Sequence, residues 1–163
     1  MKARAMVVAA VTVAAALLAP VGGPAQAAIV QCDIVGDVIE GGPGDDILFG
    51  TPRADVIRGL GGNDEIHGGG GSDTIYGGDG VDSLFGDDCA DTLHGNEDGD
   101  LLAGIDGDDT LLGNRGDDYL IGGNGTNDVD GGVGTDECSD LTSTTSLDII
   151  YIVGGGWDTP YAC

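Results

Sequence analysis

Residues 68–86 read GGGGSDTIYGGDGVDSLFG. Asp73 and Asp82 lie nine positions apart in this stretch, and Ile75 and Leu84 keep the same spacing. A segment so rich in glycine and acid is expected to be flexible, because glycine leaves the backbone permissive and few apolar groups are available for burial. The strict nine-residue spacing of one acid and one apolar residue predicts a repeated structural unit instead.

The same nine-residue unit runs without a gap from residue 41 to residue 139, eleven times. The first position is Gly in all eleven units, the sixth is Asp in ten, and the eighth is Leu, Ile or Val in ten. The exceptions are Asn127 at a sixth position and Cys138 at an eighth position. An imperfect twelfth unit precedes Gly41, with Asp37 and Ile39 in phase.

These units fit the nonapeptide GGxGxDxUx, in which U is a large apolar residue. The chain resembles the RTX (repeats-in-toxin) family of calcium-binding β-roll proteins, over about three quarters of the segment that follows residue 27. The resemblance implies an all-β fold, a parallel β-roll or β-solenoid, and it implies calcium as the ligand of the turns.

The residues themselves predict the same architecture. The last three residues of a unit, such as 74–76, form a short strand whose middle residue points inward. The first six form a turn, in which glycine permits positive φ and close approach of backbone carbonyls to a ligand. Two units then make one 18-residue coil, and coils stack as parallel strands about 4.8 Å apart in two sheets. The predicted inward columns are Leu48, Ile66, Leu84, Leu102 and Leu120 on one side, and Ile57, Ile75, Leu93, Leu111 and Val129 on the other.

The stacking also aligns the sixth positions into two acidic columns, one at each side of the roll. Stacked carboxylates repel each other unless a hard cation lies between them, and calcium accepts carboxylate and backbone carbonyl oxygens. Magnesium suits such a turn less well, because it requires a tighter octahedron and retains water. Nine stacked pairs are available, and we expect about six to nine Ca²⁺ ions. The expected side-chain ligands are Asp46, Asp64, Asp73, Asp82, Asp91, Asp100, Asp109, Asp118, Asn127 and Asp136. The glycines expected to form the metal turns are Gly41, Gly42, Gly44, Gly59, Gly68, Gly69, Gly71, Gly77, Gly78 and Gly80.

Some turns depart from the pattern. The turn GTPRAD lacks two glycines and carries Arg53, which argues against an ion between Asp55 and Asp73. Three other residues occupy glycine positions and put the conformation of their turns in question; they are Asp87, Cys89 and Asp98. Asn127 weakens its pair with Asp109 but still offers a carbonyl oxygen.

Residues 1–27 have a different composition. A basic start, an apolar run and the sequence Ala25-Gln26-Ala27 predict a Sec-type signal peptide cleaved near Ala27, and hence a secreted, extracellular protein. The run is short for a membrane span, and its alanine content suggests a bacterial source. We divide the remainder into an N-terminal cap with a degenerate repeat (28–40), the roll (41–139) and a C-terminal cap (140–163), with Trp157 as its lid.

Charge narrows the choice of partners. The chain has 5 Lys and Arg against 29 Asp and Glu, and removal of residues 1–27 takes away two basic residues, which leaves 3 − 29 = −26. Phosphates of nucleic acids and anionic membranes would be repelled. Cations are therefore the expected partners.

Four cysteines allow three disulfide connectivities. We expect a Cys138–Cys163 bond that fixes the C-terminal cap, because Cys89 and Cys138 lie too far apart along the stack. We also expect a Cys32–Cys89 bond, which requires the segment before Gly41 to fold back along the side of the roll.

For function, we expect a stand-alone extracellular binding or structural module that is not an enzyme. The alternatives are a calcium-dependent adhesion or ice-binding protein, and a small secreted hydrolase. Ice binding is considered because of the stacked column of Thr74, Thr92 and Thr110. No Ser, His and acid motif supports the hydrolase, and His67 and His94 are expected on the strand surface. A partner surface could lie on the face formed by Phe85, Leu101, Ala103, Tyr119 and Ile121.

Overall fold

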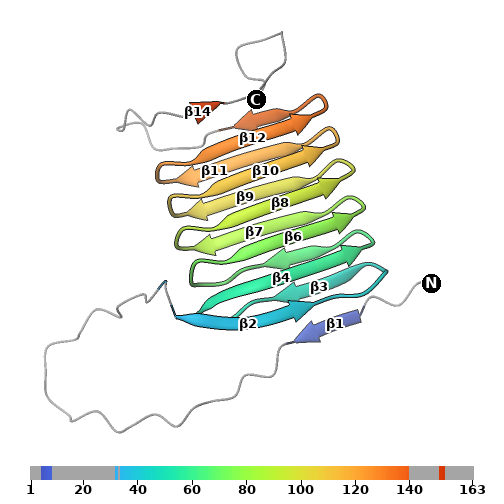
Figure 1. Cartoon of the computed structure of the whole chain (residues 1–163), viewed down its shortest axis with the longest axis vertical. Helices are drawn as coiled ribbons and strands as arrows, with labels where there is room; N and C mark the ends of the chain where they lie inside the picture. The colour runs from blue at the N-terminus through green and yellow to red at the C-terminus, as the bar shows by residue number, and fades with distance from the viewer. Residues whose placement is uncertain (1–4, 9–31, 33, 140–150, 153–163) are drawn as a thin grey trace, which may run out of the picture.

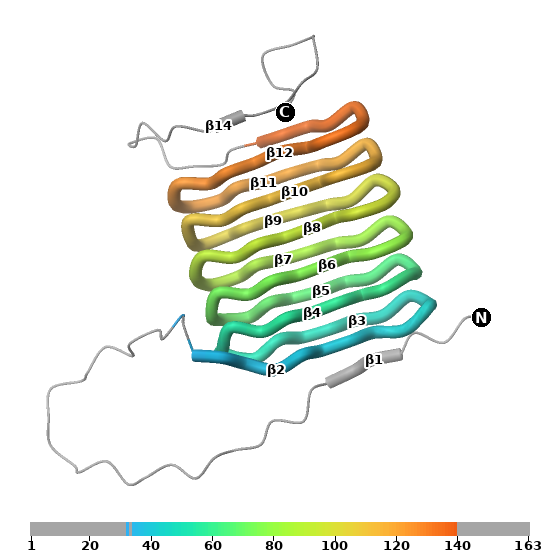
Figure 2. Tube along the Cα trace, viewed as in Figure 1, coloured from blue at the N-terminus to red at the C-terminus, as the bar shows by residue number. Residues whose placement is uncertain are grey.

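The computed structural model describes residues 5–8, 32, 34–139 and 151–152. These residues form two seven-stranded parallel sheets that face each other along a single stack of coils (Figures 1 and 2). The predicted all-β parallel roll is confirmed. The strands are β1 (Ala5–Val8), β2 (Val35–Glu40), β3 (Asp46–Phe49), β4 (Ala54–Gly61), β5 (Glu65–His67), β6 (Thr74–Asp79), β7 (Ser83–Asp88), β8 (Thr92–Glu97), β9 (Leu101–Asp106), β10 (Thr110–Arg115), β11 (Tyr119–Asn124), β12 (Asp128–Val133), β13 (Glu137–Ser139) and β14 (Tyr151–Ile152).

From Val38 to Ser139, each strand pairs with the strand one coil away, at an offset of 18 residues. Odd-numbered strands form one sheet and even-numbered strands form the other, so the chain alternates between sheets at every turn. Leu84 lies between Ile66 and Leu102 in the first sheet, and Leu93 lies between Ile75 and Leu111 in the second. Both predicted inward columns are therefore correct in every member, and Ile39 of the degenerate unit joins them through β2.

The core is a single layer of these eighth-position side chains, most of which are completely buried. Parallel sheets packed on each other bury one face of every strand, which explains why one apolar residue per unit suffices. The first-position glycines from Gly59 onward are buried as well, and each follows the apolar residue of the preceding unit by two positions.

The strands are longer than the sequence analysis predicts. The expected strand at 74–76 continues through Asp79, and most other strands likewise include the first three residues of the following unit. Only about three residues of each unit therefore lie outside the strands. The prediction was wrong here because glycine has a low strand propensity, yet hydrogen bonds to the neighbouring coils hold these residues in the sheet.

The outward ninth positions stack on one another. His67 lies between Phe49 and Phe85, with ring centroids 5.3 and 4.6 Å away, and His94 stacks on Tyr76 at 4.8 Å. Both histidines are half-buried in these stacks. The Thr74, Thr92 and Thr110 column is in register, as expected. The expected apolar face is in register too, but Ala103 is buried and only Tyr119 of the five residues is exposed, so the face offers less apolar surface than the sequence suggests.

At the ends of the stack, β1 pairs with β3 and β14 pairs with β12. β1 belongs to the predicted signal peptide, most of which lies outside the described residues, as do Trp157 and nearly all of the predicted C-terminal cap. Cys32 and Cys89 form a disulfide, so the segment before Gly41 does fold back along the roll. Cys138 is disulfide-bonded, and its predicted partner Cys163 lies outside the described residues. No helix able to cross a membrane occurs in the part of the chain that the structure describes.

Candidate metal centre

The sixth-position residues line the two sides of the stack. They form the first turn column, made of turns 41–46, 59–64, 77–82, 95–100, 113–118 and 131–136, and the second turn column, made of turns 50–55, 68–73, 86–91, 104–109 and 122–127. Each aspartate stands at or just before the start of a strand, where the chain enters the core. Their exposed fractions lie between 1 and 8 %, so all of them are buried.

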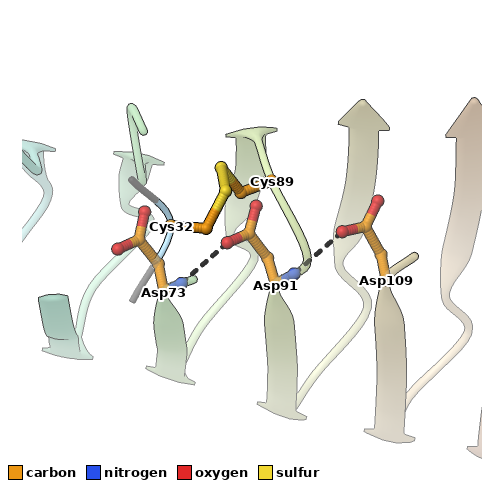
Figure 3. Close-up of a disulfide and its surroundings, with 5 residues drawn as sticks. All are labelled: Cys32, Asp73, Cys89, Asp91 and Asp109. Carbon is orange, nitrogen blue, oxygen red and sulfur yellow. Dashed lines mark hydrogen bonds between the residues drawn. A yellow bond between two sulfur atoms is a disulfide. The ribbon is translucent and has the colours of Figure 1, made fainter. Parts of the chain in front are cut away.

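A continuous ladder of hydrogen bonds joins the carboxylates of each column. The backbone N–H of each residue donates to Oδ1 of the residue one coil later, as Asp73 does to Asp91 over 2.7 Å and Asp91 to Asp109 over 2.9 Å (Figure 3). All nine predicted stacked pairs make this bond, at 2.7–3.0 Å, including Asp109 with the Asn127 side chain. The sequence therefore places every one of these residues correctly with respect to its neighbours.

The second oxygen of the carboxylate has a different environment. Seven of the described aspartates have a fully buried Oδ2 without any hydrogen-bond partner; they are Asp64, Asp73, Asp82, Asp91, Asp100, Asp109 and Asp118. A buried carboxylate oxygen without a partner is costly, because it has lost its water and gained nothing in exchange. Seven such atoms in register require a ligand or a proton.

The cost of burying these carboxylates raises their pKa values. Burial raises the pKa of Asp73 and Asp82 to about 7 and that of Asp91 and Asp100 to about 8. The neighbouring carboxylate in the column adds to this rise, whereas the ladder hydrogen bond opposes it. Burial also raises the pKa of Asp109 to about 6, and it raises the pKa values of Asp64 and Asp118. Without a cation, the four aspartates with a pKa of about 7 or 8 would be partly protonated near neutral pH.

These observations fit a hard cation with oxygen ligands. Carboxylates that are buried, stacked and incompletely bonded gain most from a divalent ion, which replaces mutual repulsion with coordination. No group of three or more His, Cys, Asp or Glu side chains converges anywhere in the described residues. An ion would therefore need backbone carbonyls of the turns to complete its ligands, which calcium readily accepts.

The predicted glycines fall into two groups with different roles. Four predicted glycines at second and fourth positions have left-handed φ, which glycine adopts without strain; they are Gly69, Gly71, Gly78 and Gly80. First-position glycines instead make room for the carboxylate; the predicted ones are Gly41, Gly59, Gly68 and Gly77. A Cβ on Gly68 would lie 2.5 Å from Asp73 Oδ2 and 2.7 Å from the carbonyl oxygen of Gly86. Sequence reasoning missed this second role, although the invariance of the first position signalled it.

The irregular turns keep the regular conformation. Asp87, Cys89 and Asp98 have φ of 72°, 85° and 70°, so they adopt the left-handed geometry of the glycines they replace. A non-glycine residue in this region carries strain of the order of 1–3 kcal/mol, and Asp87 Oδ2 accepts a hydrogen bond from Gly69 N of the preceding coil. The expected disturbance of these turns is therefore absent.

The first two turns do differ. Neither Gly42 and Gly44 nor Thr51 and Arg53 have left-handed φ. The N–H of Gly42 donates to Asp46 Oδ2, and both the N–H and the hydroxyl of Thr51 donate to Asp55 Oδ2. Gly42, Gly44 and Asp46 are thus brought to the predicted place, but in a turn whose carboxylate is already hydrogen-bonded.

Comparison with known families agrees with this geometry. A search of curated proteins found no match. The family model for the RTX calcium-binding nonapeptide repeat, which spans four copies, matches at residues 36–52, 40–75, 49–84, 67–102 and 104–138, and so covers more than half of the chain. The chain belongs to the family of RTX calcium-binding nonapeptide repeat proteins.

Proposed function

We propose that the chain is a secreted calcium-binding module whose ions lie between the stacked turns and hold the roll together. The observation that carries the proposal is the series of seven buried Oδ2 atoms without partners, from Asp64 to Asp118. Calcium binding is what the RTX repeats suggest. The number of ions, the role in folding and the extracellular role are our inference.

Calcium suits the turns better than magnesium does. It tolerates six to eight oxygen ligands in variable geometry, whereas magnesium requires a near-ideal octahedron and keeps its waters. Among the described residues, each coil contributes one sixth-position side chain per turn column, so most ligands would come from the backbone. We propose about six to nine ions, with the pair Asp55 and Asp73 the least favoured, because Thr51 already occupies Asp55 Oδ2.

Calcium is also proposed to drive folding. A formal net charge of −24 on the whole chain opposes compaction, and the apolar core is only one residue deep per unit. Ions that bind the folded state and not the unfolded state stabilise it by mass action. The roll would then be folded where calcium is abundant.

An extracellular location accords with this requirement. We propose that residues 1–27 direct secretion and are removed, and that the Cys32–Cys89 disulfide forms in an oxidising compartment. The proposal assigns no catalysis to the roll, whose buried acids serve the ladder. The module would act as a binding or structural element.

Circular dichroism of the purified chain tests the proposal. In excess chelator at pH 8 we expect a coil-like spectrum, and in millimolar calcium a β spectrum, with magnesium at equal concentration less effective. A full β spectrum in chelator, or no heat of calcium binding by calorimetry, would show that the ladder is not a calcium site.

A further inference from the structure

A short N-terminal segment crosses the second turn column and connects three of its turns. We name Cys32 and Ile34 the strap. The carbonyl oxygen of Ile34 accepts a hydrogen bond from Ala54 N, and that of Cys32 accepts one from Ser72 N, both at 2.8 Å. The Cys32–Cys89 disulfide then reaches the following turn, with Cα atoms 6.0 Å apart. The strap therefore runs along the stack, across the ends of the coils.

The strap is attached to both turns of one stacked pair. Ser72 directly precedes Asp73, and Cys89 lies two residues before Asp91. Asp73 N donates to Asp91 Oδ1, and both residues have an unpartnered Oδ2 (Figure 3). The strap thus holds one turn by a backbone hydrogen bond and the other by a covalent bond.

We propose that the Cys32–Cys89 disulfide pre-organises the Asp73–Asp91 pair, which makes it the tightest calcium site of the roll and couples calcium affinity to the redox state of these cysteines. The inference rests on the proposed calcium function. An ion between two turns requires two coils to be stacked first, and a crosslink that already limits the unfolded ensemble lowers the entropic cost of that step.

The coupling acts in both directions. If the disulfide tightens calcium binding by some factor, calcium must favour the disulfide over the two thiols by the same factor. A dithiol such as dithiothreitol reduces the bond by thiol–disulfide exchange. It transfers two electrons and two protons, becomes a cyclic disulfide, and leaves Cys32 and Cys89 as thiols. Calcium should therefore raise the dithiol concentration needed for half-reduction of this bond.

Two single variants separate the strap from the turn. C32S removes the disulfide and leaves the turn at 86–91 intact. C89G also removes the disulfide, but it places glycine where φ is 85°, so it relieves the backbone strain of the turn. In a calcium titration, the tightest site fills first, at the lowest calcium concentration. We expect both variants to weaken this first binding step by about 5- to 150-fold, the range typical of coupled sites. If the turn conformation governed affinity instead, C89G would bind calcium more tightly than the wild-type chain, and the proposal would be wrong. Both variants are compared without reductant, so that the bond of Cys138 is retained.

A second pair of variants tests whether the disulfide acts on the Asp73–Asp91 pair. Asp91→Asn and Asp118→Asn each remove a charge from a buried carboxylate with an unpartnered Oδ2, in the second and first turn columns respectively. The effect of C32S on calcium affinity should vanish in the Asp91→Asn background and persist in the Asp118→Asn background. Persistence in both backgrounds, or equal calcium affinity of wild type and C32S, would overturn the inference while leaving the calcium function intact. Absence of calcium binding in every variant would instead refute the function on which the inference rests.

Discussion

The first two turns and the later turns place their sixth-position aspartate in the same way, but they differ in whether Oδ2 of that aspartate has a hydrogen-bond partner. Turns 41–46 and 50–55 carry proline at the third position, and their second residue donates its N–H to Oδ2 of the aspartate. From turn 59–64 to turn 113–118, the second residue has left-handed φ and Oδ2 has no partner.

Proline explains the difference. It favours extended conformations in the residue before it, and Gly42 and Thr51 accordingly lack the left-handed φ of the later turns. In that extended geometry their N–H groups reach the carboxylate. The comparison teaches that a stacked aspartate is not by itself a metal ligand. The conformation of the residue four positions earlier decides the state of its Oδ2. We call the carboxylate closed where Oδ2 accepts a backbone hydrogen bond, and open where Oδ2 has no partner and is available to an ion.

The largest expected effect comes from pH, because it acts on all seven open carboxylates. Burial raises their pKa values, up to about 8 for Asp91 and Asp100, above the value of about 3.9 in an unfolded chain. The folded state therefore binds more protons than the unfolded state between these values. The stability that protonation provides is fully present below about pH 4 and is lost as the pH rises through about 6 to 8. In chelator, the chain should gain β structure on acidification from pH 8 to 5, measured by circular dichroism.

One molar sodium chloride provides the control for the pH scan. It screens repulsion among exposed charges and has less effect on buried groups. A transition that persists in salt reports the buried carboxylates, whereas loss of β structure on acidification would contradict their raised pKa values. In the same scan with calcium, the calcium midpoint should fall as the pH rises, since protons and ions compete for the same oxygens.

Asp82 and Asp55 provide a comparison at single positions. Asp82 belongs to two stacked pairs and has an open Oδ2, whereas Thr51 closes Oδ2 of Asp55. Asp82→Asn should raise the calcium midpoint at least about tenfold, a loss of about 1.4 kcal/mol of binding free energy. Asp55→Asn should instead lower the free energy of unfolding by about 1–3 kcal/mol, because an amide nitrogen would face the N–H of Thr51. Equal rises of the calcium midpoint in parallel titrations would remove the distinction between closed and open turns.

Exchange of turn sequences changes one turn at a time. Replacement of residues 69–71 by Thr-Pro-Arg converts GGGGSD into a copy of the proline turn, and replacement of residues 51–53 by three glycines does the reverse. The first variant should bind about one calcium ion fewer than wild type, and the second about one more. Native mass spectrometry counts the ions. Unchanged counts in both variants would show that proline in the turn does not control metal binding.

The smallest change in the series adds one methyl group to the space beside the carboxylate. Gly68→Ala would bring a methyl group against Asp73 Oδ2 and the Gly86 carbonyl, and should destabilise the calcium-loaded roll by about 1–3 kcal/mol. Gly44→Ala is the matched control from the first turn, since no atom lies within 4 Å of its Cβ position. Its effect should stay within about 0.5 kcal/mol in thermal unfolding. A Gly44→Ala effect as large as that of Gly68→Ala would argue against carboxylate packing as the reason for the first-position glycine.

Periodicity explains why so much of the fold could be predicted. A nine-residue unit repeated without insertions leaves only one register for the stack, so the apolar columns at Leu84 and Leu93 and the acidic ladder at Asp82 and Asp91 follow from counting. The hydrogen bond from each N–H to the next Oδ1 does not follow from counting, because it depends on how the strand enters the core.

Local conformation accounts for what was missed. Strand continuation through Asp79 and left-handed φ at Asp87 are set by contacts with adjacent coils, which propensity does not include. Closure of Asp55 by Thr51 is a hydrogen bond within one turn, and the nine-residue spacing does not show it. The Cys32–Cys89 bond is correctly predicted, but the sequence does not show the path by which the N-terminal segment folds back to form it. That path depends on two hydrogen bonds to turn residues, which have no signal in the sequence.

The most direct test of open and closed carboxylates is the anomalous X-ray scattering of calcium in crystals of the calcium-loaded chain. The account predicts peaks beside Oδ2 of the seven open aspartates, from Asp64 to Asp118, and none beside Oδ2 of Asp46 or Asp55. Peaks of equal height at Asp46 and Asp55, or no peaks along the ladder at all, would contradict it.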